Sequence, residues 1–313
     1  MDLYSIGEMV IDFIPGSEPA SYIRKAGGTP ANVAIAVAKN GLNAAMACKV
    51  GEDDFGRFLM DTLKEYNVTA ATPELCRDAV TTMAFVTLAD NGERRFTFAR
   101  KPGADMMLGE DEVREADIRD SAIIHAGSCS LSAQPVASAT VRALRLGHEF
   151  GKLVSFDVNY RNLMWNNDID ACTKAVMDVL PYVDLLKISE EEVDMMGGAD
   201  AIPELMNKNG ITLTVETLGS HGARAFFNGA TFDVPGRRVK AVDATGAGDA
   251  FWGAFLAKLR LSGVEKAADL TEPVIRAALE YGNVSGCICV QHKGAITSIP
   301  TRGEIEAYME SEK

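Results

Sequence analysis

A run of small residues leads into a helical pattern at 242–255, where the chain reads VDATGAGDAFWGAF. Apolar side chains then recur at the spacing of one buried helix face, at Phe251, Phe255 and Leu259. This pattern predicts a helix whose first turn holds Ala247, Gly248 and Asp249. The first N–H groups of a helix have no partner inside it and, with the helix dipole, they form an anion site. Gly246 and Gly248 would let a phosphate approach this backbone closely.

A carboxylate in that first turn would lie beside a bound phosphate, where a base is useful. The loose transition state of phosphoryl transfer gains from N–H dipoles around its oxygens, and Asp249 could accept the proton of the attacking hydroxyl. We expect the helix dipole to keep Asp249 ionised at neutral pH. A Gly-x-Gly-Asp string alone is also compatible with an aspartate that only caps the helix and glycines that only close a turn. The longer run favours the anion site and phosphoryl transfer.

The composition is that of a folded globular protein, with 313 residues of which 47% are hydrophobic. The net charge of -13 argues against nucleic acid as a partner, because phosphate backbones are held by basic surfaces. No apolar stretch reaches the roughly 18 residues of a membrane span, and MDLYS at the start does not resemble a signal peptide. We therefore expect a cytoplasmic protein without a membrane partner. The cysteines and histidines lack zinc-site spacing, so we expect reduced cysteines in the core.

Apolar runs alternate with helix-period stretches along the chain, which is typical of an α/β protein. We therefore predict a mainly parallel sheet with helices on both faces. The predicted strands are 44–50, 122–126, 153–158, 183–188 and 211–217. The predicted helices are 55–66, 135–150, 168–180 and 189–196.

Two stretches break this rhythm and predict antiparallel hairpins, each with a turn that accepts positive φ. The hairpins are 81–88 with 94–98 around Asn91-Gly92, and 223–227 with 231–234 around Asn228-Gly229. The first hairpin and the segment 10–23 could form a small sheet that projects from the main one. We predict a lid built from about 10–25 and 80–105. The chain shows no linker or repeat, so 1–313 is predicted to be one domain.

The sequence resembles the ribokinase-like, or PfkB, carbohydrate kinases. The C-terminal signature of that family matches DATGAGDAF at 243–251, and its N-terminal signature matches GGTPANVA at 27–34 followed by KVGEDDFG at 49–56. The resemblance implies a ribokinase-like fold, ATP and Mg²⁺ as cofactors, a small sugar as substrate, and Asp249 as the catalytic base. The implied anion hole is formed by Gly246, Ala247 and Gly248.

The resemblance also implies where the sugar binds. The family's early sugar contacts match Asp12, Gly27, Gly28 and Asn32. Carboxylate and carboxamide groups can hold vicinal hydroxyls, and glycines let the sugar ring lie against the backbone. Without the resemblance, Asn32 could equally start a helix and Asp12 could be a surface charge.

The segments 8–13, EMVIDF, and 98–108, FARKPGADMML, resemble fructokinases more than ribokinases or nucleoside kinases. This resemblance implies fructose as the acceptor, with Arg100 reaching over the sugar toward the transferring phosphate. Further candidates for the sugar site are Phe98, Asn159 and Arg161. The two arginines could instead be solvated cations, and Phe98 could pack within the lid. The alternatives are a 2-keto-3-deoxygluconate kinase or an aminoimidazole riboside kinase of the same family.

The ATP side of the site is implied by matches at 187–192, KISEEE, and 217–222, TLGSHG. The implied ATP contacts are Lys187, Ser189, Glu192, Thr217, Gly219, Gly222 and Asn283, together with Gly246 and Gly248. Glu192 keeps the family position of a carboxylate that organises Mg²⁺ through water, while Ser189 stands where asparagine is common. Without the resemblance, the glutamates indicate a charged helix start and Asn283 a residue at the edge of the core.

Many relatives also bind a monovalent cation near the anion hole. The matching K⁺ ligands here are Asp243, Thr245, Cys289, His292, Gly294 and Ser298. Asp243 could instead cap a turn. Dimers through the lid occur in the family, so we expect a homodimer through the small sheet.

Proteins of other classes fit less well. A dinucleotide-dependent oxidoreductase would carry Gly-x-Gly-x-x-Gly after its first strand, and a P-loop enzyme would carry Gly-x-x-x-x-Gly-Lys-Ser/Thr. The sequence has neither motif at these places. A catalytically silent binding protein of the same fold is expected to have lost the base or its glycines, and both are here.

Overall fold

The computed structural model describes residues 1–18, 20–88 and 94–312. Within this part of the chain, nine strands form one large sheet. In chain order they are β1 (Leu3–Ile6), β4 (Ala44–Ala47), β5 (Val68–Ala70), β8 (Ile123–Gly127), β9 (Leu153–Asp157), β10 (Leu185–Ser189), β11 (Leu213–Thr217), β12 (Gly222–Phe227) and β13 (Ala230–Pro235). Across the sheet the order is β13-β12-β11-β10-β9-β8-β1-β4-β5. All neighbours from β11 to β5 are parallel, and β12 and β13 are added antiparallel, which confirms the predicted α/β fold.

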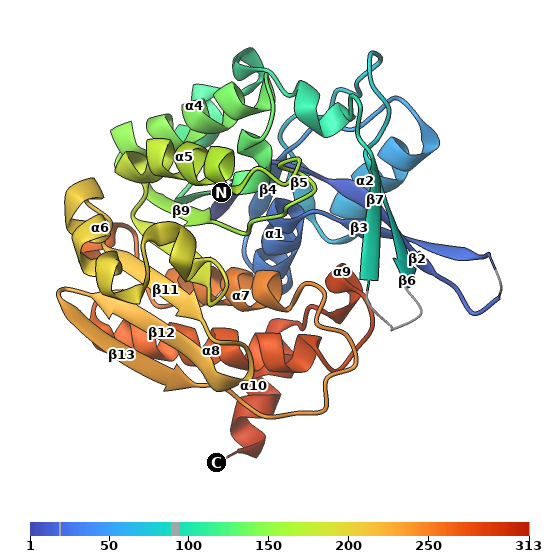
Figure 1. The fold of residues 1–313 in the computed structure, drawn as a ribbon. Coiled ribbons are helices and arrows are strands. Elements are labelled where there is room, and N and C mark those ends of the chain that lie inside the picture. The colour runs from blue at the N-terminus through green and yellow to red at the C-terminus, as the bar shows by residue number, and fades with distance from the viewer. Residues whose placement is uncertain (19, 89–93, 313) are drawn as a thin grey trace.

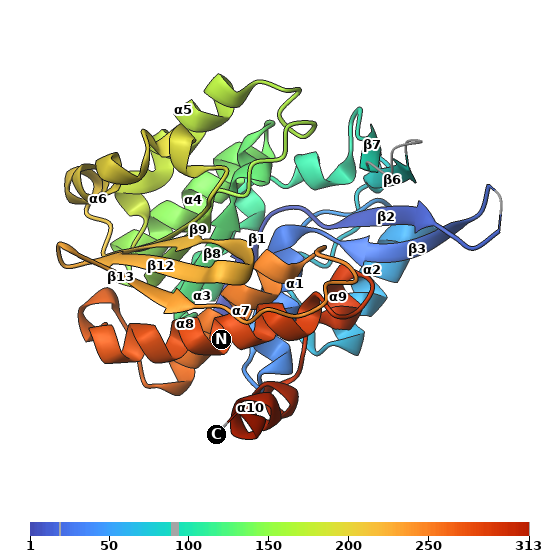
Figure 2. The ribbon, with the colours of Figure 1, turned by 60° about the horizontal axis from the view of Figure 1, so that its bottom comes forward.

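Helices cover both faces of this sheet (Figure 1 and Figure 2). One face carries α1 (Thr29–Lys39), α2 (Asp54–Glu65), α7 (Ala247–Leu261), α8 (Glu272–Cys289) and α9 (Ala295–Ser298), with α10 (Arg302–Ser311) outside α8. The other face carries α3 (Glu115–Arg119), α4 (Val136–Glu149), α5 (Ile169–Val179) and α6 (Ile202–Asn209). Neighbouring strand residues point to opposite faces, so Leu3 packs in one core cluster and Tyr4 in the other.

Helices α1 and α7 lie against each other because a glycine stands at their contact. A Cβ atom at Gly253 would lie 2.4 Å from Cβ of Ala36 and 3.0 Å from the carbonyl oxygen of Val33. The absence of a side chain at Gly253 therefore lets the two backbones approach closely. This approach places the first turns of the two helices side by side, where they meet through a hydrogen bond between side chains of each.

A second, small sheet projects from the main body, as Figure 2 shows. Its strands are β2 (Val10–Pro15), β3 (Tyr22–Gly27), β6 (Met83–Leu88) and β7 (Arg94–Ala99), in the order β3-β2-β6-β7. The pairs β2–β3 and β6–β7 are antiparallel hairpins, and β2 pairs with β6 in parallel. The predicted joining of the first hairpin with the segment 10–23 is therefore confirmed. The predicted turn residues Asn91 and Gly92 lie outside the described residues.

The second predicted hairpin is also confirmed, as strands β12 and β13. Its turn residues take positive φ, 50° at Asn228 and 74° at Gly229, which is the conformation that this dipeptide accepts readily. All six cysteines are buried and unbridged in the structure. None of the helices in the described ranges has both the length and the apolar character that crossing a membrane demands.

The predicted helix at 189–196 is wrong. Strand β10 extends to Ser189, a turn follows, and only Val193–Met196 forms a short 3-10 helix. Glu192 folds back over the turn, where its Oε2 accepts a hydrogen bond from the backbone N–H of Ser189 at 2.8 Å. Gly197 and Gly198 follow with φ of 93° and 89°, so the left-handed backbone prevents the helix from continuing.

The contact between α1 and α7 gives a stability prediction. Gly253→Ala should lower the free energy of unfolding by about 1–3 kcal/mol, because the added methyl group overlaps Ala36. The control Gly303→Ala lies in α10, where an added Cβ meets nothing within 4 Å, and it should stabilise the protein by up to about 1 kcal/mol. Urea unfolding followed by circular dichroism measures both. Equal effects would contradict a tight contact at Gly253.

Candidate active site

The predicted anion site lies at the start of α7, which begins at Ala247. Gly246, just before the helix, has φ of 79°, and a Cβ atom there would lie 2.7 Å from that of Ala295. A side chain is thus disfavoured both by the backbone conformation and by the available space. Gly248 in the first turn is exposed, whereas the N–H of Ala247 donates to the carbonyl oxygen of Ala244 at 3.2 Å. The helix start is therefore accessible to a ligand at Gly248.

Asp249 is only 7% exposed, and its carboxylate is held by a residue from the N-terminal part of the chain. In the first turn of α1, Asn32 donates a hydrogen bond from Nδ2 to Oδ2 of Asp249 at 2.6 Å. The other amide atom of Asn32, Oδ1, is buried and has no hydrogen-bond partner within the described residues. The structure therefore joins two residues that were predicted from separate motifs, and it leaves an acceptor available beside the carboxylate.

The surroundings of Asp249 shift its pKa. Burial raises the pKa of Asp249 above the usual range of an aspartate. The hydrogen bond from Asn32 lowers this pKa, the carboxylate of Asp157 raises it, and the charges of Arg161 and Lys187 lower it. We expected the dipole of α7 to favour the ionised form. The loss of hydration in the buried site is the largest contribution, so the net shift is upward.

A buried ion pair lies beneath the start of α7. Lys187 on β10 donates from Nζ to both carboxylate oxygens of Asp157 on β9, each at 2.8 Å. Both residues are buried, and this Nζ lies 3.7 Å from where a Cβ at Gly248 would stand. Burial lowers the pKa of Lys187, but Asp157 and Glu192 raise it more, so Lys187 stays charged. Lys187 thus brings a positive charge to the predicted anion site.

On the small sheet, Asp12 lies against the paired glycines. A Cβ atom at Gly27 would stand 2.2 Å from Oδ2 of Asp12, and one at Gly28, where φ is 114°, would stand 2.4 Å from the carbonyl oxygen of Glu8. Both glycines are therefore required by the close approach of neighbouring atoms. Asp12 is half-buried, and burial raises its pKa to about 6 while the charge of Arg161 lowers it. The interpretation of Asp12 as a plain surface charge does not fit these surroundings.

The two candidate arginines differ in their environment. Arg161 is exposed, and its charge acts on both Asp12 and Asp249. Arg100 has only 9% of its side chain exposed, and its Nη2 lies 2.8 Å from Oδ2 of Asp105. Its Nη1 also donates to Oγ of Ser132 at 3.2 Å. The alternative of a solvated cation therefore fails for Arg100, which is held at the junction of the two sheets.

Two further candidates lie on the loops that follow β9 and β10. Asn159 has φ of 35° and donates from Nδ2 to the hydroxyl of Thr29 at the start of α1. The buried Glu192 accepts hydrogen bonds from the backbone N–H of Tyr160 at 2.6 Å and of Ser189 at 2.8 Å. Glu192 thus ties the two loops together, and it is not a solvated charge at a helix start. Phe98 on β7 is half-buried and packs against the core cluster of Tyr4.

The remaining ATP candidates lie near β11, β12 and α8. Thr217 ends β11, Gly219 has φ of 54°, and a Cβ atom at Gly222 would stand 2.2 Å from the carbonyl oxygen of Val234. Asn283 on α8 donates from Nδ2 to the carbonyl oxygens of Val234 at 3.1 Å and of Pro235 at 3.2 Å. The loops after β9, β10 and β11 open at the carboxyl edge of the parallel strands, where α/β proteins bind ligands.

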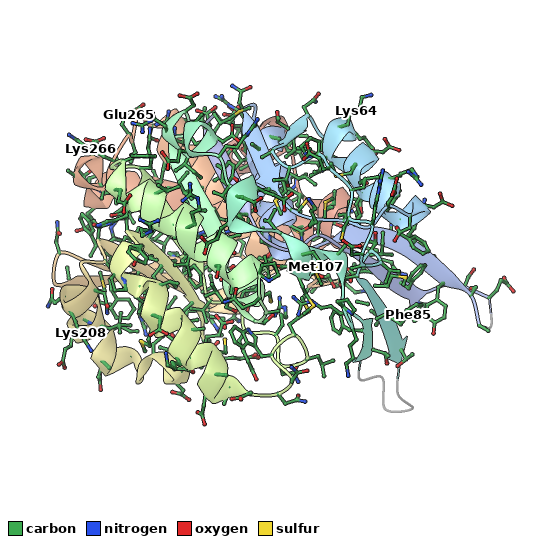
Figure 3. The ribbon with its side chains drawn as sticks, turned by 90° about the horizontal axis from the view of Figure 1, so that it is seen from above. Lys64, Phe85, Met107, Lys208, Glu265 and Lys266 are labelled. Carbon is green, nitrogen blue, oxygen red and sulfur yellow. The ribbon has the colours of Figure 1, made fainter. Side chains whose placement is uncertain are left out.

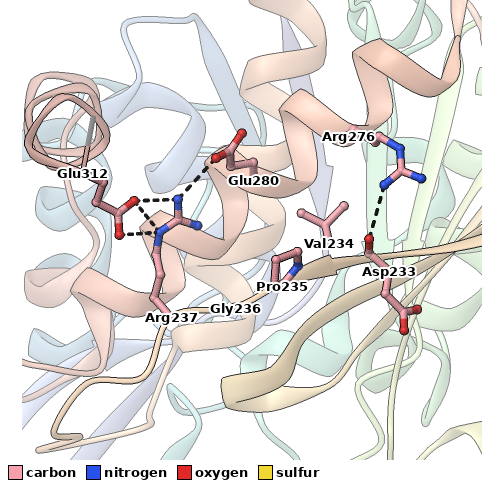
Figure 4. A pocket seen from close by; sticks show the side chains of 8 residues that line it. All are labelled: Asp233, Val234, Pro235, Gly236, Arg237, Arg276, Glu280 and Glu312. Atoms are coloured by element: carbon pink, nitrogen blue, oxygen red, sulfur yellow. Dashed lines mark hydrogen bonds and ion pairs between the residues drawn. The ribbon is translucent and has the colours of Figure 1, made fainter.

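A pocket of about 410 Å³ adjoins this region (Figure 4). It is lined by Asp233, Val234, Pro235, Gly236, Arg237, Arg276, Glu280 and Glu312. The guanidinium of Arg237 pairs with Glu312 near the end of α10 and with Glu280 on α8. The pocket contains none of the predicted site residues, but Val234 and Pro235 in its wall are the backbone acceptors of Asn283.

Most of the predicted cation ligands also meet. Asp243 accepts hydrogen bonds from the N–H of Thr245 at 3.0 Å and from the N–H of Gly294 at 3.1 Å. Cys289 lies alongside, with Sγ 3.9 Å from the carbonyl oxygen of Thr245. The hydroxyl of Ser298 is buried and lacks a hydrogen-bond partner among the described residues. Asp243 therefore stabilises its own loop, in agreement with the alternative that it caps a turn. Oxygen atoms of several of the predicted ligands lie in this region.

In this fold a buried carboxylate and an exposed helix start lie at the carboxyl edge of the parallel strands, an arrangement that suits phosphoryl transfer. Residues 2–302 match the family described as "pfkB family carbohydrate kinase". Fructokinase-1 of Oryza sativa subsp. japonica is 37% identical over 318 residues, which cover 98% of this chain and 97% of that protein.

Two solved structures are similar over nearly the full length. Fructokinase with bound ATP from Xylella fastidiosa has a TM-score of 0.91 at 30% identity and covers 99% of this chain and 98% of its own. Fructokinase from Vibrio cholerae O395 in a fructose, ADP and calcium ion bound form has a TM-score of 0.88 at 32% identity, with 98% of both chains covered. The chain therefore belongs to the pfkB family of carbohydrate kinases and has the ribokinase-like fold.

Sequence reasoning did not single out two buried carboxylates near the site. Asp157 pairs with Lys187, and Glu8 lies under the paired glycines. For Asp157 a signal was present, because it is a charged residue that ends an apolar run and so stands at the carboxyl end of a parallel strand. Glu8 gives no such signal, since a single carboxylate beside Gly7 is equally typical of an exposed turn.

The contact between Asn32 and Asp249 predicts a change in titration. Asn32→Ala should raise the pKa of Asp249 further, because the carboxylate loses a donor that favours its ionised form. An NMR titration with ¹³C-labelled aspartate carboxyl groups measures this shift. The exposed control Asn43→Ala should leave it unchanged. A pKa that stays constant or falls in Asn32→Ala would show that the hydrogen bond does not set the charge of Asp249.

Proposed function

We propose that the protein is an ATP-dependent fructokinase, which converts ATP and D-fructose to ADP and D-fructose 6-phosphate. The observation that carries this proposal is the buried Asp249 carboxylate in the first turn of α7, held by Asn32 beside an accessible helix start. The similarity to fructokinases, one of them with fructose and ADP bound, supports fructose as the acceptor.

In this proposal Asp249 is the general base. It accepts the proton of the attacking hydroxyl while that oxygen bonds to the γ-phosphorus and the bond to the bridging oxygen of ADP breaks. The anion hole of Gly246, Ala247 and Gly248 stabilises the charge on the transferring group through backbone N–H groups. Asn32 keeps the carboxylate oriented through its 2.6 Å hydrogen bond. The raised pKa of Asp249 suits a group that must hold a proton late in the transfer.

Fructose would lie between the small sheet and the start of α7. Asp12 accepts hydrogen bonds from sugar hydroxyls, and the unpartnered Oδ1 of Asn32 accepts another. Gly27 and Gly28 let the ring approach the backbone. The charge of Arg161 acts on both Asp12 and Asp249, which supports a place for this residue between the sugar and the base. We also assign Phe98, Asn159 and Arg100 to the sugar site.

ATP would lie along the carboxyl ends of β10 and β11, with its phosphates at α7. The proposed contacts are Lys187, Ser189, Glu192, Thr217, Gly219, Gly222, Gly246, Gly248 and Asn283. When bound, Mg²⁺ neutralises phosphate charge, and it typically keeps several waters and one or two carboxylates. Both oxygens of Glu192 already accept backbone N–H groups, so Glu192 would meet the ion through water.

We further propose a K⁺ site beside the anion hole. Its ligands would be Asp243, Thr245, Cys289, His292, Gly294 and Ser298. The donor set fits a monovalent cation, since the Asp243 carboxylate and the buried Ser298 hydroxyl, which lacks a partner in the described part of the chain, both present oxygen. A bound cation would add positive charge near the start of α7.

The small sheet would act as a lid that excludes water from the transferring phosphate. Arg100 follows its last strand, β7, and would carry a positive charge toward the phosphate when the lid closes. We also propose a homodimer through this sheet, because Tyr22 and Ile23 on β3 are 44% and 48% exposed. Phe85, labelled on the projecting sheet in Figure 3, stacks on Phe13 of the neighbouring strand β2, with ring centroids 4.9 Å apart.

Loss of the base should leave binding and remove turnover. Asp249→Asn should lower kcat by roughly two to four orders of magnitude, the range for a missing general base, with little change in ATP affinity. An ADP-release assay and calorimetric titration with ATP measure the two effects. The control Asp54→Asn changes a side chain that is 98% exposed and should keep full activity. Near-full activity of Asp249→Asn would exclude Asp249 as the base.

The acceptor is tested by comparing kcat/KM for fructose, ribose, 2-keto-3-deoxygluconate and aminoimidazole riboside, with Mg²⁺ and K⁺ present. We expect fructose to give the highest value. A higher value for another acceptor would overturn the assignment of fructose and leave the phosphotransferase site intact.

A further inference from the structure

Polar side chains gather where the chain passes between the two sheets. Within the described residues the chain crosses between the two sheets four times, at 7–9, at Gly28, at 71–82 and at 100–103. The first pair of connections leads into and out of the β2–β3 hairpin, and the second pair leads into and out of β6–β7 (Figure 2). Any fixed orientation of the small sheet must be set at these connections.

The third and fourth connections are tied by Asp105. Its carboxylate accepts a hydrogen bond from the hydroxyl of Thr82, just before β6, and pairs with the guanidinium of Arg100, just after β7. The N–H of Ala104 also donates to the carbonyl oxygen of Val80 at 2.8 Å. Asp105 is buried and Arg100 is largely buried, so this tie is mostly shielded from water.

The first and second connections are tied by Glu8, which is 5% exposed. Its Oε1 accepts a hydrogen bond from the backbone N–H of Thr29 at 3.2 Å, at the start of α1. Its own carbonyl oxygen lies against Gly28, where a Cβ would approach it to 2.4 Å. Asn32, which holds the carboxylate of Asp249, lies one helical turn after Thr29. Glu8 therefore acts on the start of the helix that presents Asn32.

Within the described residues, no cation forms an ion pair with the carboxyl of Glu8. Burial raises its pKa to about 7, the nearby Asp105 adds to this, and Arg100 acts in the opposite direction. The second carboxyl oxygen, Oε2, is buried without a hydrogen-bond partner in the described part of the chain. Burying such a group costs folding free energy, so stability alone is a poor reason for it.

We propose that Glu8 is a positioning residue for phosphoryl transfer. Its carboxyl ties the base of the β2–β3 hairpin to the start of α1, and this tie positions Asp12 and Gly27 on one side and Asn32 on the other for the reaction at Asp249. This inference rests on the proposed kinase activity but not on the choice of fructose. A misplacement of about 1 Å in a reacting group can slow an enzyme on the order of a hundredfold, which makes such positioning measurable.

The test compares side chains of different length and charge at position 8. Glu8→Gln keeps the length and the acceptor for Thr29, so kcat/KM for the sugar should stay within about threefold of wild type. Glu8→Asp keeps the charge but is one methylene too short, and kcat/KM should fall at least about tenfold. The KM for ATP should not change in either variant, because the proposed ATP contacts lie on the main sheet. Glu310→Asp, at an exposed glutamate on α10, is the matched control and should leave kcat/KM unchanged.

Thermal unfolding of each variant separates positioning from a purely structural role. A fall in Tm for Glu8→Asp with unchanged kcat and sugar KM would overturn the proposal, and so would an equal loss of activity in Glu8→Gln and Glu8→Asp. If Glu8→Asp does not fold, Glu8→Met keeps the packing and removes the acceptor, and the same loss is expected. If the wild-type enzyme prefers another sugar, the variants are assayed with that sugar. A failure of the fructose proposal is then distinguishable from a failure of the proposal for Glu8.

Discussion

The arrangement of the site depends on the close packing of α1 against α7. The hydrogen bond between Asn32 and Asp249 joins residues that are 217 positions apart in the chain. It forms because Gly253 lets two helix backbones approach where a side chain would hold them apart. The same contact sets the distance between the paired glycines before α1 and the glycine-rich start of α7. The sugar side and the phosphate side of the site are thus positioned by one helix pair.

The charges around this helix pair explain how an acidic protein can receive an anion. The chain carries a net charge of -13, yet the start of α7 is surrounded by open N–H groups, Lys187 and Arg161. Lys187 is kept charged by Asp157, and Arg100 is held by Asp105. Each buried cation is therefore fixed in place by a carboxylate. The local field at α7, and not the overall charge, suits a phosphorylated ligand.

The sequence predicts the fold class well because the parallel strands are continuous apolar runs and the hairpins carry Asn-Gly turns. Shorter or atypical elements were not recognised. Strands β1 and β5 have only four and three residues, and α1 is buried along nearly its whole length, so its apolar residues mark no single face. The helix predicted at 189–196 failed because Glu192 bonds to the backbone instead of facing solvent. For the site, two separate motifs indicated Asn32 and Asp249, and the structure joins these residues by a hydrogen bond. The burial that raises the pKa of Asp249 and the charge cluster at Glu8 depend on tertiary contacts, which no local pattern records.

The small sheet is built from two separate stretches, β2–β3 and β6–β7, that meet through the parallel pairing of β2 with β6. Parallel strands cannot be joined by a tight turn, so the chain returns to the main sheet and forms α1, β4, α2 and β5 between them. An isolated two-stranded hairpin is marginally stable at best in water. The small sheet is therefore not a module that evolution could add or remove in one step. Each hairpin therefore depends on the other for its stability, and a substitution in β2 or β6 is limited by what the partner strand tolerates.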